Sequence, residues 1–248
     1  MLKKTNLENE ARKTDMPGIG FIETFKQSME RQDKLTIVAY GDSWTYGSVA
    51  EGWYEARDRG YDSSLITGSW ASMLRDVVAA RNAQAAVFNE GVGGWTAPRG
   101  LEAYAEKVAP HRPDYVILNF GINDWKNGLP LADYEAAMNA IVARVKEDGG
   151  QTVLWTSGPL SVAGVQTYGW PQPWDGSKLA HTFAEFTAAL HRLAEAHDLP
   201  LADAAADIEA LHASGEDLQD WFFDSIHFKQ QGHDMILRRI AATLGLPE

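Results

Sequence analysis

Short apolar runs alternate with stretches of helical periodicity along this chain. The runs suited to buried strands lie at residues 35–40, 85–88, 115–120 and 152–156, with a weaker one at residues 199–203. Between them, apolar residues recur at steps of three and four, as they do on one face of an amphipathic helix. Such alternation is typical of parallel strands joined by crossover helices. The pattern therefore predicts an α/β fold.

The helical stripes are expected to face the core and not a cofactor. They comprise Trp70, Met73, Leu74, Val77 and Val78; Tyr134, Met138, Ile141 and Val145; Leu179, Phe183, Phe186, Leu190 and Leu193; and Met235, Ile236, Ile240 and Leu244.

The length of 248 residues suits one α/β domain. We expect residues 1–34 to form an N-terminal tail and a short helix near residues 21–29, which serves packing or oligomer contact, and residues 35–248 to form the domain. Two connections are long, at residues 47–68 and 158–177. They hold tryptophans, which are rare in disordered segments, so we expect a rim or lid over a site.

The charge balance limits the partners. With 34 acidic against 22 basic residues, the formal charge is -12, which disfavours nucleic acid and anionic membranes. Cysteine is absent, which excludes disulfides and thiolate nucleophiles. The first residues lack an apolar signal region, and no run reaches about 18 apolar residues. A cytoplasmic protein that does not cross a membrane is expected, with its oligomeric state left open.

Two distant segments carry the parts of a nucleophilic enzyme. Ser43 lies in the run Tyr40-Gly41-Asp42-Ser43-Trp44-Thr45-Tyr46-Gly47, and Asp224 stands three residues before His227. A serine hydroxyl becomes a good nucleophile only when a base removes its proton, and a carboxylate can orient that base. The combination indicates acyl transfer.

Two further segments each follow an apolar run and are expected to be turns at strand ends. They are Asn89-Glu90-Gly91-Val92-Gly93-Gly94 and Gly121-Ile122-Asn123-Asp124. Glycine allows backbone N–H groups close to a reacting oxygen, and an asparagine amide is a neutral donor to the same oxygen. Together the two turns could form an oxyanion hole.

In these four blocks the chain resembles the SGNH hydrolases, or GDSL esterases. The blocks are Gly41-Asp42-Ser43, Gly94, Gly121-Ile122-Asn123-Asp124 and Asp224-Ser225-Ile226-His227, in the family's order and within residues 35–244. The resemblance implies a flavodoxin-like three-layer α/β/α sandwich with a central five-stranded parallel sheet. Trp44 replaces the leucine common after the serine, which bears on the substrate and not on the chemistry.

The resemblance also implies roles for these residues. Ser43 is the expected nucleophile, His227 the base and Asp224 its orienting carboxylate. The N–H groups of Ser43 and Gly94 and the side chain of Asn123 are the expected oxyanion hole. Asp42 and Asp124 are expected to brace loops. Neither a cofactor nor a metal is needed.

Each block alone has another interpretation. Gly-Asp-Ser is common at turns, and Gly-x-Asn-Asp can cap a helix. Asp224 and His227 could be an ion pair, or half of a metal site with His233 and Asp234, although no His-Glu-x-x-His motif supports a metal. Their ordered occurrence together favours catalysis.

The substrate is indicated only by aromatic residues. Flat rings suit sugar stacking as well as hydrophobic packing, and the candidates for substrate contact are Trp44, Trp95, Trp125, Trp170 and Trp174. We expect an esterase for short acyl groups, foremost acetyl, on a carbohydrate or similar polar alcohol. The alternatives are a general short-chain carboxylesterase or thioesterase, and an inactive carbohydrate-binding protein with this fold.

Overall fold

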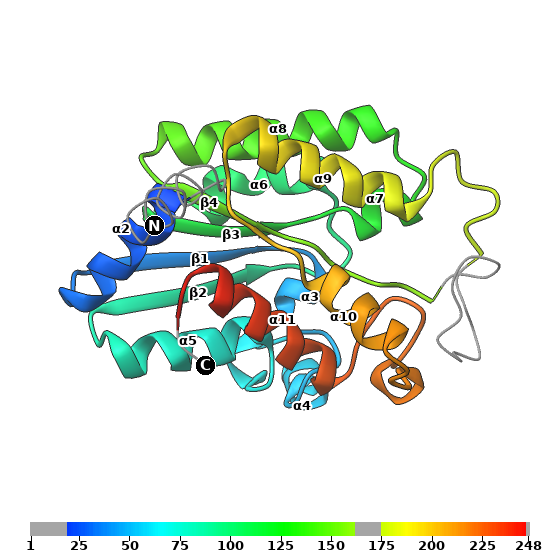
Figure 1. The fold of residues 1–248 in the computed structure, drawn as a ribbon, viewed down its shortest axis with the longest axis horizontal. Helices are drawn as coiled ribbons and strands as arrows, with labels where there is room; N and C mark the ends of the chain where they lie inside the picture. Colours follow the sequence, from blue (N-terminus) through cyan, green and yellow to red (C-terminus); the bar gives the residue numbers. More distant parts are fainter. Residues whose placement is uncertain (1–18, 162–174, 247–248) are drawn as a thin grey trace, which may run out of the picture.

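The computed structural model describes residues 19–161 and 175–246, and its centre is a parallel sheet (Figure 1). Its five strands are arranged in the order β2-β1-β3-β4-β5. Their bounds are β1 (Leu35–Gly41), β2 (Ala85–Gly91), β3 (Tyr115–Asn119), β4 (Gln151–Trp155) and β5 (Leu201–Ala202). All neighbouring strands pair in parallel. The predicted fold class is confirmed, and the weak fifth run is the two-residue β5.

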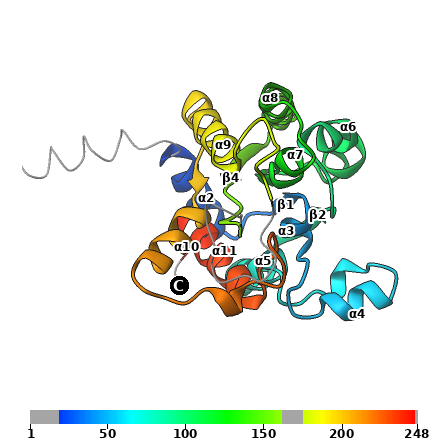
Figure 2. The same ribbon diagram turned by 90° about the vertical axis from the view of Figure 1, so that its right-hand side faces the viewer.

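Helices cover both faces of the sheet. They are α2 (Ile19–Glu30), α3 (Ser43–Tyr46), α4 (Trp53–Asp58), α5 (Trp70–Arg81), α6 (Ala97–Lys107), α7 (Ile122–Lys126), α8 (Leu131–Glu147), α9 (Phe183–His197), α10 (Ala204–Ala213) and α11 (Gln230–Thr243). Single 3₁₀ turns lie at Ser63–Leu65, Ala109–His111 and Gln219–Trp221. Helices α6, α8 and α9 lie on one side of the sheet and α5 and α11 on the other (Figures 1 and 2).

The core lies between these layers because the central strands are apolar on both faces. Every residue of β3 is buried, and in β1 only Thr36 is partly exposed. Parallel strands covered by helices on both sides are expected to be continuous apolar runs of this kind. The strands thereby form a rigid support for the turns that follow them.

The expected N-terminal helix is present as α2 and packs on the sheet. The rings of Phe21 and Phe25 meet the ring of Tyr115 edge-on, with centroids 5.1 and 5.2 Å apart. Both phenylalanines belong to the main hydrophobic core. The domain boundary at residue 34 stays a prediction, but α2 contributes to the same core as the sheet.

The structure departs from the predicted pattern around α9. The apolar stripe predicts a helix that includes Leu179, whereas the helix begins at Phe183. Thr182 and Glu185 form a capping box, in which each side chain accepts a hydrogen bond from the other residue's backbone N–H. This cap fixes the first turn, so Leu179 belongs to the preceding loop.

The structure describes the two long connections to different extents. Residues 47–68 contain α4 and the turn Ser63–Leu65, so this segment is partly helical. Most of the connection at 158–177, including Trp170 and Trp174, lies outside the described residues. No helix in the described parts of the chain combines the length and apolarity needed to cross a bilayer.

The carboxyl ends of the strands meet at one edge of the molecule, which faces the viewer in Figure 2. Strand β1 lies between β2 and β3, so the chain moves out from β1 in both directions. Ligands of open α/β sheets bind at such a switch point, outside the carboxyl ends of the strands. The turns after β1, β2 and β3 carry Ser43, Gly94 and Asn123, respectively.

Candidate active site

Ser43 is the first residue of the one-turn helix α3. Asp42 caps this helix, with its carboxylate accepting the Trp44 N–H at 3.0 Å. The turn ends at Gly47, where a φ of 96° suits glycine and the N–H reaches the Ser43 carbonyl. The first N–H groups of a helix have no acceptor within it. The Ser43 N–H is therefore of the type that can donate a hydrogen bond to an external anion.

The predicted base and carboxylate lie on a tight loop that we call the hairpin, residues 222–228. Its ends are held by an antiparallel bridge between Phe222 and Phe228. His227 Nε2 lies 2.9 Å from Ser43 Oγ, although 184 positions separate the residues. His227 Nδ1 lies 2.8 Å from Asp224 Oδ2. The carboxylate can only accept, so Nδ1 carries the proton and Nε2 is free to accept from the serine hydroxyl.

The hairpin also sets the charge state of Asp224. Burial on its own would raise the pKa of this carboxyl, but hydrogen bonding and charge interaction with His227 act against burial. The backbone N–H groups of Ile226 and His227 add to this effect by donating to Asp224 Oδ1 at 2.9 and 2.7 Å. The net result is a pKa below the usual value. Asp224 is therefore an anion that holds the imidazole in one orientation.

The other two turns face the serine from β2 and β3. Gly94 has a φ of 81°, which disfavours any residue with a Cβ. A Cβ built on Gly93 would lie 3.9 Å from the Ser43 Cβ, which places this turn beside the nucleophile. Asn123 is 5 % exposed, and its Nδ2 donates to the Trp95 carbonyl at 3.0 Å. This bond fixes the amide and leaves the second Nδ2 hydrogen for another acceptor.

Two buried carboxyls support these turns from behind. Asp124 accepts the Ala97 N–H with its two oxygens at 3.0 and 3.2 Å, which ties α7 to the start of α6. Asp42 and Asp124 are both 0 % exposed. Burial raises the pKa of Asp42 to about 7 and that of Asp124 to about 6. These contacts agree with the bracing role expected of both residues.

His233, considered above as a metal partner of His227, has a different environment. It is 2 % exposed, and its Nε2 donates to the Ser48 carbonyl at 3.2 Å. Burial lowers the pKa of His233 to about 4, so the ring is neutral near pH 7. It links α11 to the loop that follows the nucleophile. Within the described ranges, no three His, Asp or Glu side chains are grouped as metal ligands.

The tryptophans predicted to contact substrate occupy different positions. Trp44 is 2 % exposed and packs against Trp155 and Phe228, so its burial does not favour the predicted substrate contact, which stays a prediction. The position after the serine faces the sheet, where a large apolar side chain is buried.

Trp125 and Trp95 differ in their exposure. Trp125 is also 2 % exposed, and its Nε1 donates to the His181 carbonyl at 3.1 Å. Trp95 is partly exposed, with the Arg99 guanidinium over its ring at 5.3 Å. Among the three described tryptophans of the five candidates, Trp95 is therefore the one whose exposure best suits the predicted substrate contact.

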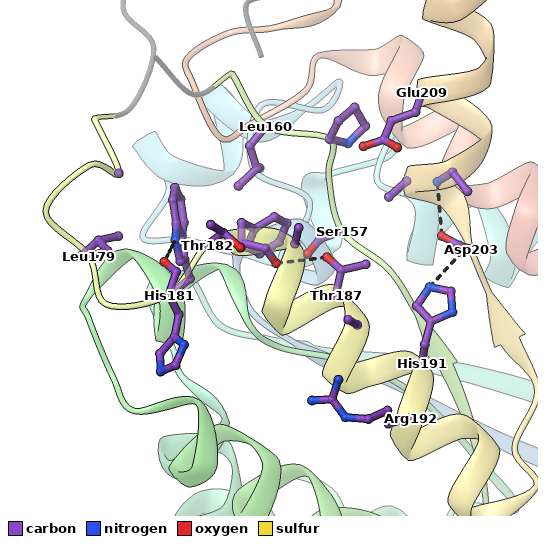
Figure 3. A pocket seen from close by; sticks show the side chains of 18 of the residues that line it. Ser157, Leu160, Leu179, His181, Thr182, Thr187, His191, Arg192, Asp203 and Glu209 are labelled. Carbon is purple, nitrogen blue, oxygen red and sulfur yellow. Dashed lines mark hydrogen bonds and ion pairs between the residues drawn. The ribbon is translucent and has the colours of Figure 1, made fainter. Parts of the chain in front are cut away.

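A cavity of about 830 Å³ opens beside the site, between α9, α10 and the loop after β4 (Figure 3). Trp125 and Leu160 line it, together with His191 and Asp203, where His191 Nε2 lies 3.0 Å from Asp203 Oδ2. Neither Ser43 nor His227 is among the described residues that line this cavity. It is connected to the hairpin through the next residue of the loop, Ser161, whose N–H donates to the Ser225 carbonyl at 3.0 Å.

The roles of several residues around the site were not predicted from the sequence. His233 and Ser161 hold the nucleophile loop and the hairpin, and Phe223 and Tyr54 are exposed beside it. The run Trp221-Phe222-Phe223 directly before Asp224 was a usable signal, because adjacent aromatics on a hairpin cannot all face inward. The Ser161 and His233 contacts leave no comparable pattern in the sequence.

The chain is similar to known proteins in sequence and in fold. The model of the GDSL-like Lipase/Acylhydrolase family matches residues 39–235. An arylesterase of Vibrio mimicus is 27% identical over 89 residues, which are 36% of this chain and 44% of that protein. The match therefore spans less than half of the curated relative.

Solved structures share the fold. LAE5, an α/β hydrolase enzyme from the metagenome of Lake Arreo in Spain, superposes with a TM-score of 0.67 at 19% identity, covering 85% of this chain and 95% of LAE5. Axe2, an acetylxylan esterase of Geobacillus stearothermophilus, gives a TM-score of 0.67 at 19% identity, covering 86% of this chain and 95% of Axe2. At these identities the likeness concerns the fold alone.

Proposed function

The chain belongs to the GDSL-like lipase/acylhydrolase family, and on this premise we propose that it is a serine esterase that hydrolyses short-chain acyl esters, foremost acetyl esters, of a carbohydrate or similar polar alcohol. The observation that carries the proposal is the continuous hydrogen-bond chain from Ser43 through His227 to Asp224, with links of 2.9 and 2.8 Å. These distances lie within the reach that proton transfer between a nucleophile and its base requires.

The first half of the reaction forms an acyl-enzyme. As Ser43 Oγ attacks the ester carbonyl, its proton moves to His227 Nε2, and the anionic Asp224 stabilises the imidazolium that results. The imidazolium then donates this proton to the leaving alkoxide when the tetrahedral intermediate collapses. The alcohol departs, and the acyl group remains on Ser43.

Charge on the tetrahedral oxygen is met by donors of the three turns. They are the N–H groups of Ser43 and Gly94 and the free Nδ2 hydrogen of Asn123. These donors are supported by Asp42, by Asp124 and by the Trp95 carbonyl, so they need little reorganisation during the reaction. Preorganised donors of this kind supply a large part of the rate enhancement in acyl transfer.

The second half of the reaction releases the acid. A water molecule takes the place of the departed alcohol, and neutral His227 removes its proton as it attacks the acyl carbonyl. Collapse of the second tetrahedral intermediate returns the proton to Ser43 Oγ. The same residues thus serve both halves, and none is consumed.

A carbohydrate ester as substrate is supported by the surface beside the site and by one structural neighbour. Axe2 is an acetylxylan esterase. Trp95, Tyr54 and Phe223 offer partly or largely exposed rings around the hairpin and the turns. Aromatic rings with polar neighbours suit sugars, which present C–H groups on their faces and hydroxyls at their edges.

The second candidate is a general short-chain carboxylesterase without sugar preference. The local similarity to a protein named an arylesterase favours it, because that name implies aryl esters and not sugar esters. The two candidates share the chemistry at Ser43 and differ only in the alcohol. Acetate release from acetylated oligosaccharides, compared with hydrolysis of phenyl acetate, distinguishes them.

A chromogenic acetyl ester tests the esterase proposal. Wild-type protein is expected to hydrolyse 4-nitrophenyl acetate, and Ser43→Ala to lose on the order of 10⁴-fold to 10⁶-fold in kcat. Ser48→Ala is the matched control, since it removes a nearby hydroxyl outside the hydrogen-bond chain and should retain activity. Equal rates for wild type and Ser43→Ala would refute the proposal.

A further inference from the structure

We propose that a surface hollow between α4 and the hairpin is a subsite for a neutral sugar ring of the alcohol, at a distance from the ester that Ser43 attacks. The hollow has a volume of about 780 Å³. We call it the aromatic hollow; its lining is formed by residues 49–52, Tyr54, Glu55, Phe223 and residues 229–231. The proposal rests on the esterase function above and adds the place where the rest of the substrate lies.

The hairpin places Phe223 next to the proposed base. Because Phe222 and Phe228 form an antiparallel bridge, the next pair inward is Phe223 and His227, and the Phe223 N–H donates to the His227 carbonyl at 2.9 Å. Residues directly opposite each other in such a pair have their side chains on the same face, about 4.5–5.5 Å apart at Cβ. A substrate that extends from Ser43 past His227 therefore meets the ring of Phe223.

The rings around the hollow are exposed in a way that packing does not require. Phe223 is 40% exposed and Tyr54 is 50% exposed, while Phe222 in the same hairpin is fully buried. Trp53 joins them, with its ring centroid 4.9 Å from that of Tyr54 and 6.4 Å from that of Phe223. The Arg57 guanidinium lies over Trp53 and Tyr54 at 5.6 and 5.3 Å, which holds these two rings in place. Grouped exposed aromatics mark interaction sites.

Polar groups at the rim select the kind of ligand. Glu51, Glu55, Lys229, Gln230 and Gln231 line the hollow together with the rings. A sugar satisfies both sets at once, since its C–H face covers an aromatic ring while its hydroxyls bond to carboxylate, amide and ammonium groups. An alkyl chain would offer no hydrogen-bond partner to the charged side chains of this rim. An anionic ligand would face two carboxylates and a protein of net charge -12.

The backbone beneath the hollow is held in an unfavourable conformation. Val49 has a φ of 74°, a region that a β-branched residue rarely occupies. Gln230 holds the adjoining loop, since its Oε1 accepts the Glu51 N–H at 3.0 Å and its Nε2 donates to the Gly68 carbonyl at 2.9 Å. Such strain persists where the surroundings impose a shape, most often at binding sites.

Binding of unacetylated oligosaccharides tests the subsite without turnover. The protein is the Ser43→Ala variant, and the ligands are xylohexaose and cellohexaose. Their Kd values are measured by isothermal titration calorimetry and by intrinsic tryptophan fluorescence, to which Trp53 contributes. Phe223→Leu and Tyr54→Leu each remove a ring and keep an apolar side chain. We expect each to raise the Kd of the better ligand at least 10-fold. Phe88→Leu, which removes another 40% exposed ring on β2, should change the Kd less than 2-fold.

Steady-state kinetics on active protein, in which Ser43 is retained, give the second measurement. For Phe223→Leu and Tyr54→Leu, the ratio of kcat/KM on acetylated xylooligosaccharide to kcat/KM on 4-nitrophenyl acetate should fall at least 10-fold, mainly through KM. An unchanged ratio in both variants would overturn the subsite, as would oligosaccharide affinities that do not differ between these variants and Phe88→Leu. Absence of binding by Ser43→Ala would also overturn it. None of these results bears on whether Ser43 is the nucleophile, which the activity of Ser43→Ala decides separately.

Discussion

At the scale of single residues, the proposed chemistry depends on a few contacts of less than 3.1 Å. The contacts of His227 with Ser43 and Asp224 could be predicted from the sequence, because these residue types in this order indicate a nucleophile, a base and an orienting carboxylate. Their supports were not, because the His233 contact with Ser48 and the Ser161 contact with Ser225 join groups that any sequence could contain. The direction of the Trp44 side chain could not be predicted for a related reason, since a residue next to a nucleophile can face either the cleft or the sheet.

Asn123 can be tested as an oxyanion donor. Replacing it by alanine removes one side-chain donor and should lower kcat about 100- to 1000-fold, equivalent to about 2.7–4 kcal/mol of barrier, with a much smaller change in KM. Steady-state kinetics on 4-nitrophenyl acetate measure both constants. Asn139→Ala, on the exposed surface of α8, is the control. A loss below 5-fold in Asn123→Ala would remove this residue from the oxyanion hole.

Asp42 gives a pH-dependent prediction of stability. Its pKa is raised from 3.8 to about 7 in the folded protein, so between these values the native state retains a proton that the unfolded chain loses. The free energy of unfolding therefore falls as the pH rises through this window, by on the order of 4 kcal/mol from this group. Asn at this position is neutral at every pH and can still accept the Trp44 N–H.

We therefore expect Asp42→Asn to gain stability relative to wild type between pH 4 and pH 8. Urea denaturation at both pH values measures the difference. Asp76→Asn, which changes an exposed carboxylate on α5, should show no comparable trend. A stability difference between Asp42→Asn and wild type that is the same at both pH values would contradict the burial effect.

At the scale of helices and strands, the strands were the most predictable part because a buried parallel strand is a continuous apolar run. Helix ends were less predictable, since a side-chain cap decides them. The capping box of Thr182 and Glu185 excluded Leu179 from α9. The one-turn helix α3 is too short for any periodicity, and yet its first residue is the proposed nucleophile.

Helix α2 provides a test at this scale. Phe25 is fully buried against Tyr115, so Phe25→Ala should lower the free energy of unfolding by about 3–5 kcal/mol. Urea denaturation of the full chain measures this loss. Glu23→Ala changes an exposed residue of the same helix and should alter stability by less than about 0.5 kcal/mol. Equal effects of the two substitutions would show that α2 is not part of the core.

At the scale of the whole molecule, the sheet order brings distant blocks together. Parallel strands in the order β2-β1-β3 direct three successive turns to one edge, and the hairpin before α11 reaches the same edge. The order of the blocks predicted this convergence, but only the fold shows that the hairpin also carries Phe223 toward α4. The cavity near Trp125 and the aromatic hollow likewise have no signature in the sequence, because several separate segments form each of them.

Covalent labelling tests the central claim, that Ser43 is the nucleophile activated by His227, most directly. A 4-nitrophenyl alkylphosphonate is attacked like an ester but leaves a stable adduct, so intact-protein mass spectrometry should show one phosphonyl group per chain and peptide mapping should place it on Ser43. Replacing His227 by alanine should slow this labelling strongly, because the serine proton then has no acceptor. Labelling at another residue, or labelling of Ser43 at an unchanged rate without His227, would contradict the account.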